Sequence, residues 1–140
     1  MDMSSLLRHQ MIESLATPPA EKGADVAMRL WEQMSTKIIS IVGEGGFQSL
    51  YVRSLFLARA RFPWLAADAL PTQTDQLFAQ LNTCFESQAP EQARAANSLL
   101  LITFTDILAS LIGEALTTSI LRSAWDSDAS DLAGKGFKNE

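Results

Sequence analysis

The chain has 140 residues, of which 47% are hydrophobic and 19% are charged, and its formal net charge is −5. This composition fits one compact globular domain and excludes disorder over most of the chain. The acidic balance leaves no broad basic surface for a phosphate backbone, so nucleic acid is not expected as a main partner.

The first predicted element is a short N-terminal helix over residues 4–15, with Leu7, Met11, Ile12 and Leu15 on its apolar side. A helix of this length is marginal in water, so residues 1–16 are expected to dock on the body as a peripheral helix. The segment lacks the basic start and unbroken apolar run of a signal peptide. A cytoplasmic location is therefore expected.

The clearest amphipathic helix is predicted over residues 25–42. It ends at Gly43-Glu44-Gly45-Gly46, because three glycines in four residues would cost a continuous helix about 1 kcal/mol each. No Lys-Ser or Lys-Thr pair follows and no strand precedes this run, so it is not a phosphate loop. We expect a tight turn with Glu44 at the start of the next helix; a small-anion site reaching Arg53 is the alternative.

The next helix is predicted over residues 47–62, is apolar over more than half of its circumference, and ends before Pro63. Its last turn, Arg59-Ala60-Arg61-Phe62-Pro63-Trp64, combines guanidinium groups with aromatic rings, as binding hot spots do. The alternative is an ordinary helix end with its aromatic rings packed inward. A fourth helix opens at residues 71–74 and ends before Pro90, with Cys84, the only cysteine, on its apolar side as a core residue.

The longest helix is predicted over residues 91–112. Its apolar stretch from Leu99 to Ile112 is shorter than the roughly 20 residues of a membrane span, so it is expected to be a core helix and no membrane is expected as a partner. Asp106 lies in this apolar stretch, and a buried carboxylate needs a partner. The expected structure is a salt bridge, and the alternative is the floor of a polar pocket. The candidate partners of Asp106 are Arg53, Arg59, Arg61 and Arg122.

This helix is expected to bend or break at Gly113-Glu114, and a final short helix follows to Trp125. The remaining residues, 126–140, show no periodicity and are rich in small polar side chains, which predicts a mobile acidic tail. The predicted fold is all-α: a single-domain bundle over residues 1–125, with about four principal helices and shorter helices at the ends.

Two stretches 70 residues apart, 38–44 and 108–114, share the pattern of an apolar helix followed by Gly-Glu. The similarity reflects either a duplication with a possible internal pseudo-twofold axis or chance between two apolar helices. If the halves are related, Glu44 and Glu114 are candidates for a facing pair that holds a metal ion or shares a proton. The alternative is two solvated carboxylates at helix ends.

His9 is the only histidine, so the sequence predicts no multi-histidine metal site and no conventional Ser-His or Cys-His pair. No catalytic residue, cofactor or metal is therefore assigned, and the protein is not expected to be an enzyme. A phosphotransfer role for His9 is less well supported, because His9-Gln10-Met11-Ile12-Glu13 differs from the His-x-Leu-Lys-Gly run usual in histidine phosphotransfer domains.

The favoured hypothesis is a non-enzymatic regulatory or protein–protein interaction module that acts through an apolar helical face. It predicts a protein partner and a homodimer. The alternatives are a sensor with an apolar pocket among Trp31, Phe56, Phe78 and Phe104, and a phosphotransfer or signalling component. The candidate interaction residues are Arg53, Arg59, Arg61, Phe62, Trp64 and Asp106; the candidate structural joints are Gly43, Glu44, Gly45, Gly46, Gly113 and Glu114.

Overall fold

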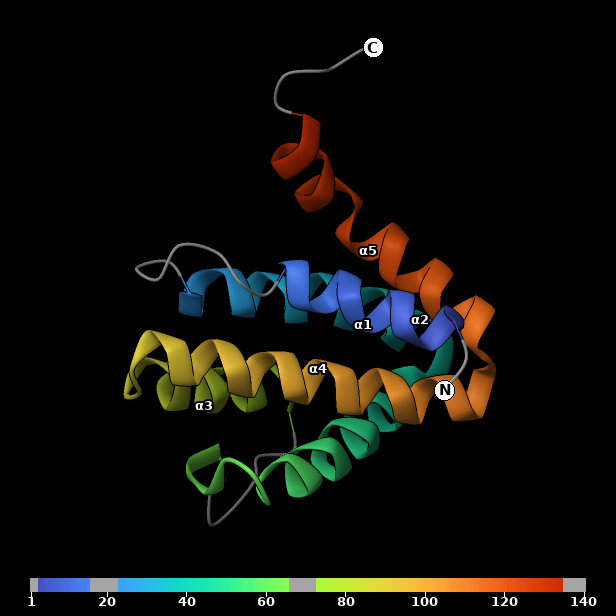
Figure 1. The fold of residues 1–140 in the computed structure, drawn as a ribbon. Coiled ribbons are helices and arrows are strands. Elements are labelled where there is room, and N and C mark those ends of the chain that lie inside the picture. Colours follow the sequence, from blue (N-terminus) through green and yellow to red (C-terminus); the bar gives the residue numbers. More distant parts are fainter. Residues whose placement is uncertain (1–2, 16–22, 66–72, 135–140) are drawn as a thin grey trace.

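The computed structural model describes residues 3–15, 23–65 and 73–134, and within these ranges the protein is all-α, as the sequence predicts (Figure 1). The described part contains five α-helices, one short 3-10 helix and no strand. The elements are α1 (Met3–Leu15), α2 (Gly23–Ala58), η2 (Pro63–Leu65), α3 (Thr74–Glu86), α4 (Pro90–Ile112) and α5 (Glu114–Gly134).

The chain turns sharply at two glycines, as predicted, and so forms two helix–glycine–helix units. Gly43 interrupts α2 with φ 84° and ψ 162°, and Gly113 separates α4 from α5 with φ 100° and ψ 149°. Both conformations lie in a region that is essentially restricted to glycine. The two units form V shapes in Figure 1, with both joints at the same side of the molecule.

The two units also bury the same positions. Between residues 27 and 55, every buried residue has a buried counterpart 70 residues later, and no other residue in 97–125 is buried. The joints also share a local hydrogen bond: the hydroxyl of Ser40 donates to the Lys37 carbonyl at 2.6 Å, and that of Ser110 donates to the Ile107 carbonyl at 2.6 Å. The 70-residue similarity is therefore a repeat of backbone conformation and burial.

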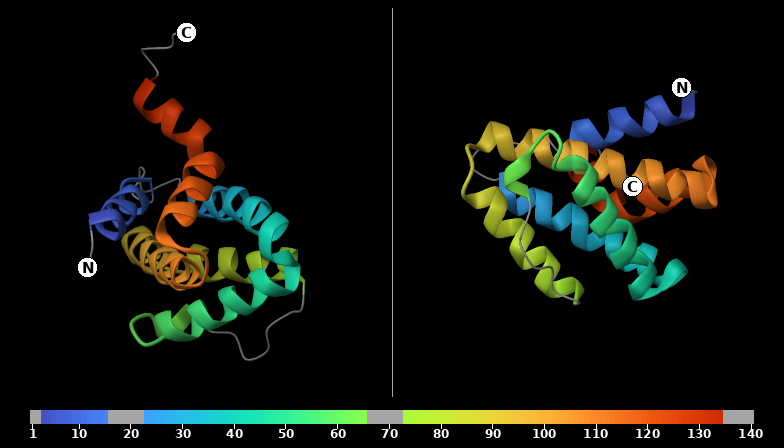
Figure 2. Two further views of the ribbon diagram at one scale, coloured as in Figure 1. Left: turned by 90° about the vertical axis from the view of Figure 1, so that its right-hand side faces the viewer. Right: turned by 90° about the horizontal axis from the view of Figure 1, so that it is seen from below.

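Each half of the chain consists of one helix followed by a helix–glycine–helix unit: α1 precedes the unit of α2, and α3 precedes the unit of α4 and α5. Each of the two preceding helices packs on the unit of the other half. Helix α1 packs against α4 and α5, whereas α3 packs mainly against α2 and also contacts α4 (Figures 1 and 2). Arg8 of α1 and Phe78 of α3 are 70 residues apart and so hold equivalent positions in the two halves, and both side chains are buried. The halves are thus intertwined around one core.

That core lies where α2 and α4 meet, and aromatic rings fill it. The Trp31 ring lies 5.5 Å from the rings of Tyr51 and Phe104, centroid to centroid, with nearly perpendicular planes. The Trp31 Nε1 donates to Asn97 Oδ1 at 2.8 Å. This hydrogen bond gives a partner both to the buried indole N–H and to the buried amide oxygen. Helix α4 is the one described helix long and apolar enough to cross a membrane, but it packs among the other four, as a core helix does.

Two helix ends differ from the prediction. Helix α5 continues to Gly134, so the expected loss of regular structure after Trp125 is wrong for residues 126–134; its last turns project away from the other helices (Figure 1). Residues 135–140, the rest of the predicted mobile tail, lie outside the described residues. Helix α2 ends at Ala58 rather than Phe62, although the Phe62 amide still donates to the Ala58 carbonyl at 3.0 Å.

The predicted docking face of α1 is also partly wrong. Ile12 is fully buried, but Leu7 is 54% exposed and Arg8 is buried in its place. The side chain of Arg8 therefore occupies the interface that the sequence assigns to a leucine.

Candidate functional site

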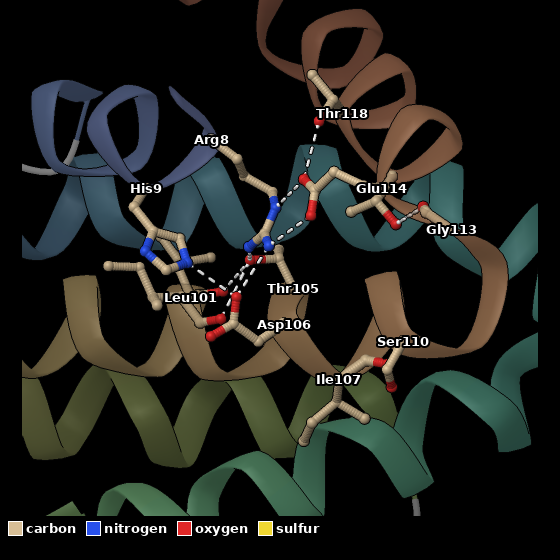
Figure 3. A network of polar contacts seen from close by, with 12 residues as sticks. Arg8, His9, Leu101, Thr105, Asp106, Ile107, Ser110, Gly113, Glu114 and Thr118 are labelled. Carbon is tan, nitrogen blue, oxygen red and sulfur yellow. Dashed lines mark hydrogen bonds and ion pairs between the residues drawn. The ribbon is translucent and has the colours of Figure 1, made fainter. Parts of the chain in front are cut away.

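Helix α1 places Arg8 in a polar cluster between α4 and α5 (Figure 3). The side chain is only 2% exposed, and its guanidinium group binds both oxygens of Glu114: Nε lies 2.6 Å from Oε2, and Nη2 lies 3.0 Å from Oε1. The Arg8 Nη1 donates to the Thr105 hydroxyl at 2.7 Å, and Nη2 lies 2.9 Å from Asp106 Oδ1. A buried cation is thus paired with two carboxylates and one hydroxyl.

The surroundings of Arg8 keep it charged. Burial alone lowers the pKa of Arg8, but hydrogen bonds to Glu114 and Asp106, together with their charges, outweigh burial and raise it. Glu114 is in the first turn of α5, where the helix dipole favours a negative charge, and it also accepts a hydrogen bond from Thr118 at 3.2 Å. The cluster therefore joins α1, α4 and α5 through one charged network.

Asp106 takes part in this cluster, but differently from the prediction. Its Oδ1 lies 2.8 Å from His9 Nε2 and 2.9 Å from Arg8 Nη2, whereas the predicted partners were Arg53, Arg59, Arg61 and Arg122. Its side chain is 48% exposed, so the prediction of a buried carboxylate is also wrong. The segment is apolar because its other faces pack in the core, while Asp106 lies at the outer edge of α4 beside α1 (Figure 3).

In the first half, the counterpart of this cluster is an open groove of about 960 Å³ between α2 and α3. Glu44, Ser35 and Thr36 are the counterparts of Glu114, Thr105 and Asp106, and all three line the groove. The counterpart of Arg8 is Phe78, whose ring packs 6.1 Å from that of Trp31 in the core. The first half therefore has no arginine at the position that corresponds to Arg8.

Glu44 starts the second segment of α2, as predicted, and accepts a hydrogen bond from the Thr74 hydroxyl of α3 at 2.9 Å. Gln48 in turn donates to the same hydroxyl at 3.2 Å. Glu44 and Glu114 thus hold different helices, α3 and α1, and no contact joins the two carboxylates in the described structure. Gly45 and Gly46 lie within the helix that follows the joint.

The predicted arginine–aromatic cluster is divided between the surface and the interior. Arg53, Arg59 and Arg61 are exposed, whereas Phe62 and Trp64 are half-buried against the core. The two rings lie 5.8 Å apart in an edge-to-face arrangement. The aromatic rings therefore support the fold, and the guanidinium groups are the accessible part of this segment.

The four aromatic residues of the predicted apolar pocket, Trp31, Phe56, Phe78 and Phe104, do not face one common space in the described part of the chain. The rings of Trp31, Phe78 and Phe104 pack together in the core, and Phe56 is 70% exposed on the outer face of α2. Cys84 is half-buried rather than a core residue, and burial raises the pKa of its thiol.

Arg8 is the site residue that the sequence analysis missed, and His9 was considered there only for catalysis, metal binding or phosphotransfer, not as a partner of Asp106. Arg8 lies at the spacing of the apolar face, four residues before Ile12 and seven before Leu15, and a charge on such a face signals a buried ion pair. Comparisons of the chain with known protein families, curated proteins and solved structures found no match.

Proposed function

We propose that the protein is a non-enzymatic cytoplasmic interaction module that binds another protein through the outer face of α2 between Glu44 and Ala58. The observation that carries the proposal is the exposure of Phe56, which is 70% accessible on a helix whose opposite face is anchored in the core by Tyr51 and Leu55. Val52, one turn earlier, adds to the same exposed stripe at 36%. A large ring held in water on a rigid helix indicates a contact surface.

A comparison of the two halves strengthens this proposal. The residues 70 positions after Val52 and Phe56 are Arg122 and Asp126, so the second half carries charged residues where the first carries apolar ones. The buried faces of these helices agree position by position, whereas the outer faces do not. The apolar stripe is therefore a feature of the first half that the shared fold does not require.

The chemistry of the partner follows from the flanking charges. Helical spacing places Arg53 beside the Val52–Phe56 stripe. Arg59 follows the last residue of α2, where its amide donates to the Leu55 carbonyl at 3.0 Å, and both arginines are exposed. Arginine beside an aromatic ring is common at energetically important interface positions, and complementary charge increases the association rate. We infer a partner that presents an apolar surface with acidic side chains around it.

Site-specific photo-crosslinking in cells of the native host tests this proposal. Phe56 is replaced by benzoylphenylalanine in one variant, and Leu111, which is 67% exposed, is replaced in a control variant. The expected result is a discrete adduct with another protein at position 56 and none of comparable yield at position 111. Equal labelling at both positions, or none at position 56, would contradict the proposal.

The predicted homodimer remains a second form of the same proposal, in which another copy covers the stripe. A symmetric contact would place Arg53 and Arg59 of one copy near those of the other, so added salt should strengthen it by screening their repulsion. Light scattering at micromolar concentration should then give about 31 kDa, twice the 15.3 kDa of one chain. Phe56→Ser should restore the monomer mass, and a wild-type monomer at all salt concentrations would exclude this form.

A further inference from the structure

The groove between α2 and α3 is the first-half counterpart of a site that holds a guanidinium group in the second half. In the second half, Arg8 binds Glu114, Thr105 and Asp106 at distances of 2.6–3.0 Å. Their three counterparts, Glu44, Ser35 and Thr36, all line the groove. The molecule therefore contains one occupied and one open version of the same arrangement.

The hydrogen-bonding state of the groove indicates what it lacks. The hydroxyl groups of Ser35 and Thr36 both donate to the Glu32 carbonyl at 3.0 Å, which leaves their remaining lone pairs as acceptors. Thr105 does the same in the second half: it donates to the Leu101 carbonyl at 2.9 Å and accepts from Arg8. A hydroxyl in this state is suited to a ligand that only donates hydrogen bonds.

The carboxylate of Glu44 is a further acceptor in the groove. Among the described residues, only the Thr74 hydroxyl bonds to the Glu44 carboxylate, which therefore retains acceptor capacity. A cationic donor that enters the groove can therefore form a charge-assisted hydrogen bond with this carboxylate.

The charge and walls of the groove agree with a cation on an alkyl chain. Glu32, Glu44 and Asp75 contribute three negative charges and Arg29 contributes one positive charge, which gives a net charge of −2 for the lining. Apolar side chains also line the groove, and they can cover an alkyl stem. These apolar residues are Met28, Ile39 and Phe78.

We propose that this groove binds an alkylguanidinium group, with the guanidinium between Glu44 and the hydroxyl groups of Ser35 and Thr36. The site is separate from the stripe on the outer face of α2, because none of Val52, Arg53, Phe56 and Arg59 lines the groove. It thus adds a small-cation site to the interaction surface proposed above, and either can fail without the other.

Titration of ¹⁵N-labelled full-length protein with butylguanidinium at constant ionic strength tests the proposal by NMR. The expected result is saturable shifts centred on the amides of Ser35, Thr36, Glu44 and Thr74. Neutral butylurea has the same shape without the charge. It should bind at least tenfold more weakly, which corresponds to a loss of about 1.4 kcal/mol in binding free energy. Equal binding of butylurea, or shifts spread over other acidic surfaces, would overturn the proposal.

Two groove variants and one control variant make the test specific. Glu44→Gln removes the charge while its amide oxygen can still accept from Thr74, and it should weaken butylguanidinium binding at least tenfold; Glu91→Gln, exposed on α4 outside the groove, should leave it unchanged. Thr36→Lys places a competing cation at an exposed lining position and should also abolish binding. Full-strength binding by both groove variants would refute the assignment.

The guanidinium can belong to a free small molecule or to an arginine of another protein. A helix-stabilised peptide with the sequence of residues 3–15, which carries Arg8, distinguishes these sources. If the peptide binds at the groove tenfold more tightly than butylguanidinium, the site takes an arginine on a helix. If butylguanidinium binds as tightly or more tightly, the site takes a small molecule, and absence of groove shifts with both probes overturns the proposal.

Discussion

Alanine at the two joints should destabilise the protein by similar amounts. A Cβ atom at Gly43 or Gly113 would meet no atom within 4 Å, so the cost comes from the backbone alone. Holding a non-glycine residue at φ 84° or 100° with extended ψ costs about 1–3 kcal/mol. Alanine also restricts the unfolded chain, which returns about 0.4–1 kcal/mol. The expected net loss is about 1–2 kcal/mol for each of Gly43→Ala and Gly113→Ala.

Urea unfolding followed by circular dichroism measures these differences, and Gly45→Ala provides the internal control. Gly45 lies in the same segment with helical geometry and open space around it, so alanine there should stabilise the protein by about 0.5–1 kcal/mol. Opposite signs at Gly43 and Gly113 would refute the inference that the two joints are conformationally equivalent. A gain at both would contradict the backbone cost assigned to their positive φ angles.

Three further predictions concern the described side chains. Arg8→Met should lower the free energy of unfolding by about 2–3 kcal/mol in the same assay, less than for a fully buried pair because Glu114 and Asp106 are 19% and 48% exposed; an unchanged midpoint would contradict the role of the cluster. Burial, with a smaller contribution from Cys84, raises the pKa of Tyr51, so the unfolded state ionises first and stability should fall above about pH 10; Tyr51→Phe should reduce this fall, and identical pH profiles would exclude the effect. Because burial raises the pKa of Cys84, its thiol should react with a thiol reagent at pH 7.5 more slowly in native protein than in urea, and equal rates would contradict this.

The sequence was sufficient to predict helices and their breaks where the physical signal is local. Apolar periodicity located most helices, and the conformational cost of glycine located both joints. The 70-residue similarity became decisive only in three dimensions, because the residues that the halves share are few while the positions that they bury agree throughout 27–55 and 97–125.

The site was harder to predict because its contacts are long-range. Arg8 lies 97 and 106 positions from Thr105 and Glu114, and helical periodicity says nothing about which helices meet. Charge pairing alone suggested four arginines as partners of Asp106, but its partner is a fifth, Arg8, on the N-terminal helix that was predicted to be peripheral. The groove could not be predicted either, because it lies between two helices, α2 and α3, whose contact is also long-range, and because Phe78, the counterpart of Arg8, packs against Trp31 in the core.

Charge reversal on the outer faces of the two halves tests the interaction proposal most directly. With benzoylphenylalanine at position 56, we predict that Arg53→Glu combined with Arg59→Glu abolishes the cross-linked adduct. Arg122→Glu is the control, because Arg122 is exposed at the α5 position that corresponds to Val52, and it should leave the adduct unchanged. An adduct of equal yield in the wild type, the double variant and the control would contradict binding through the arginine-flanked stripe.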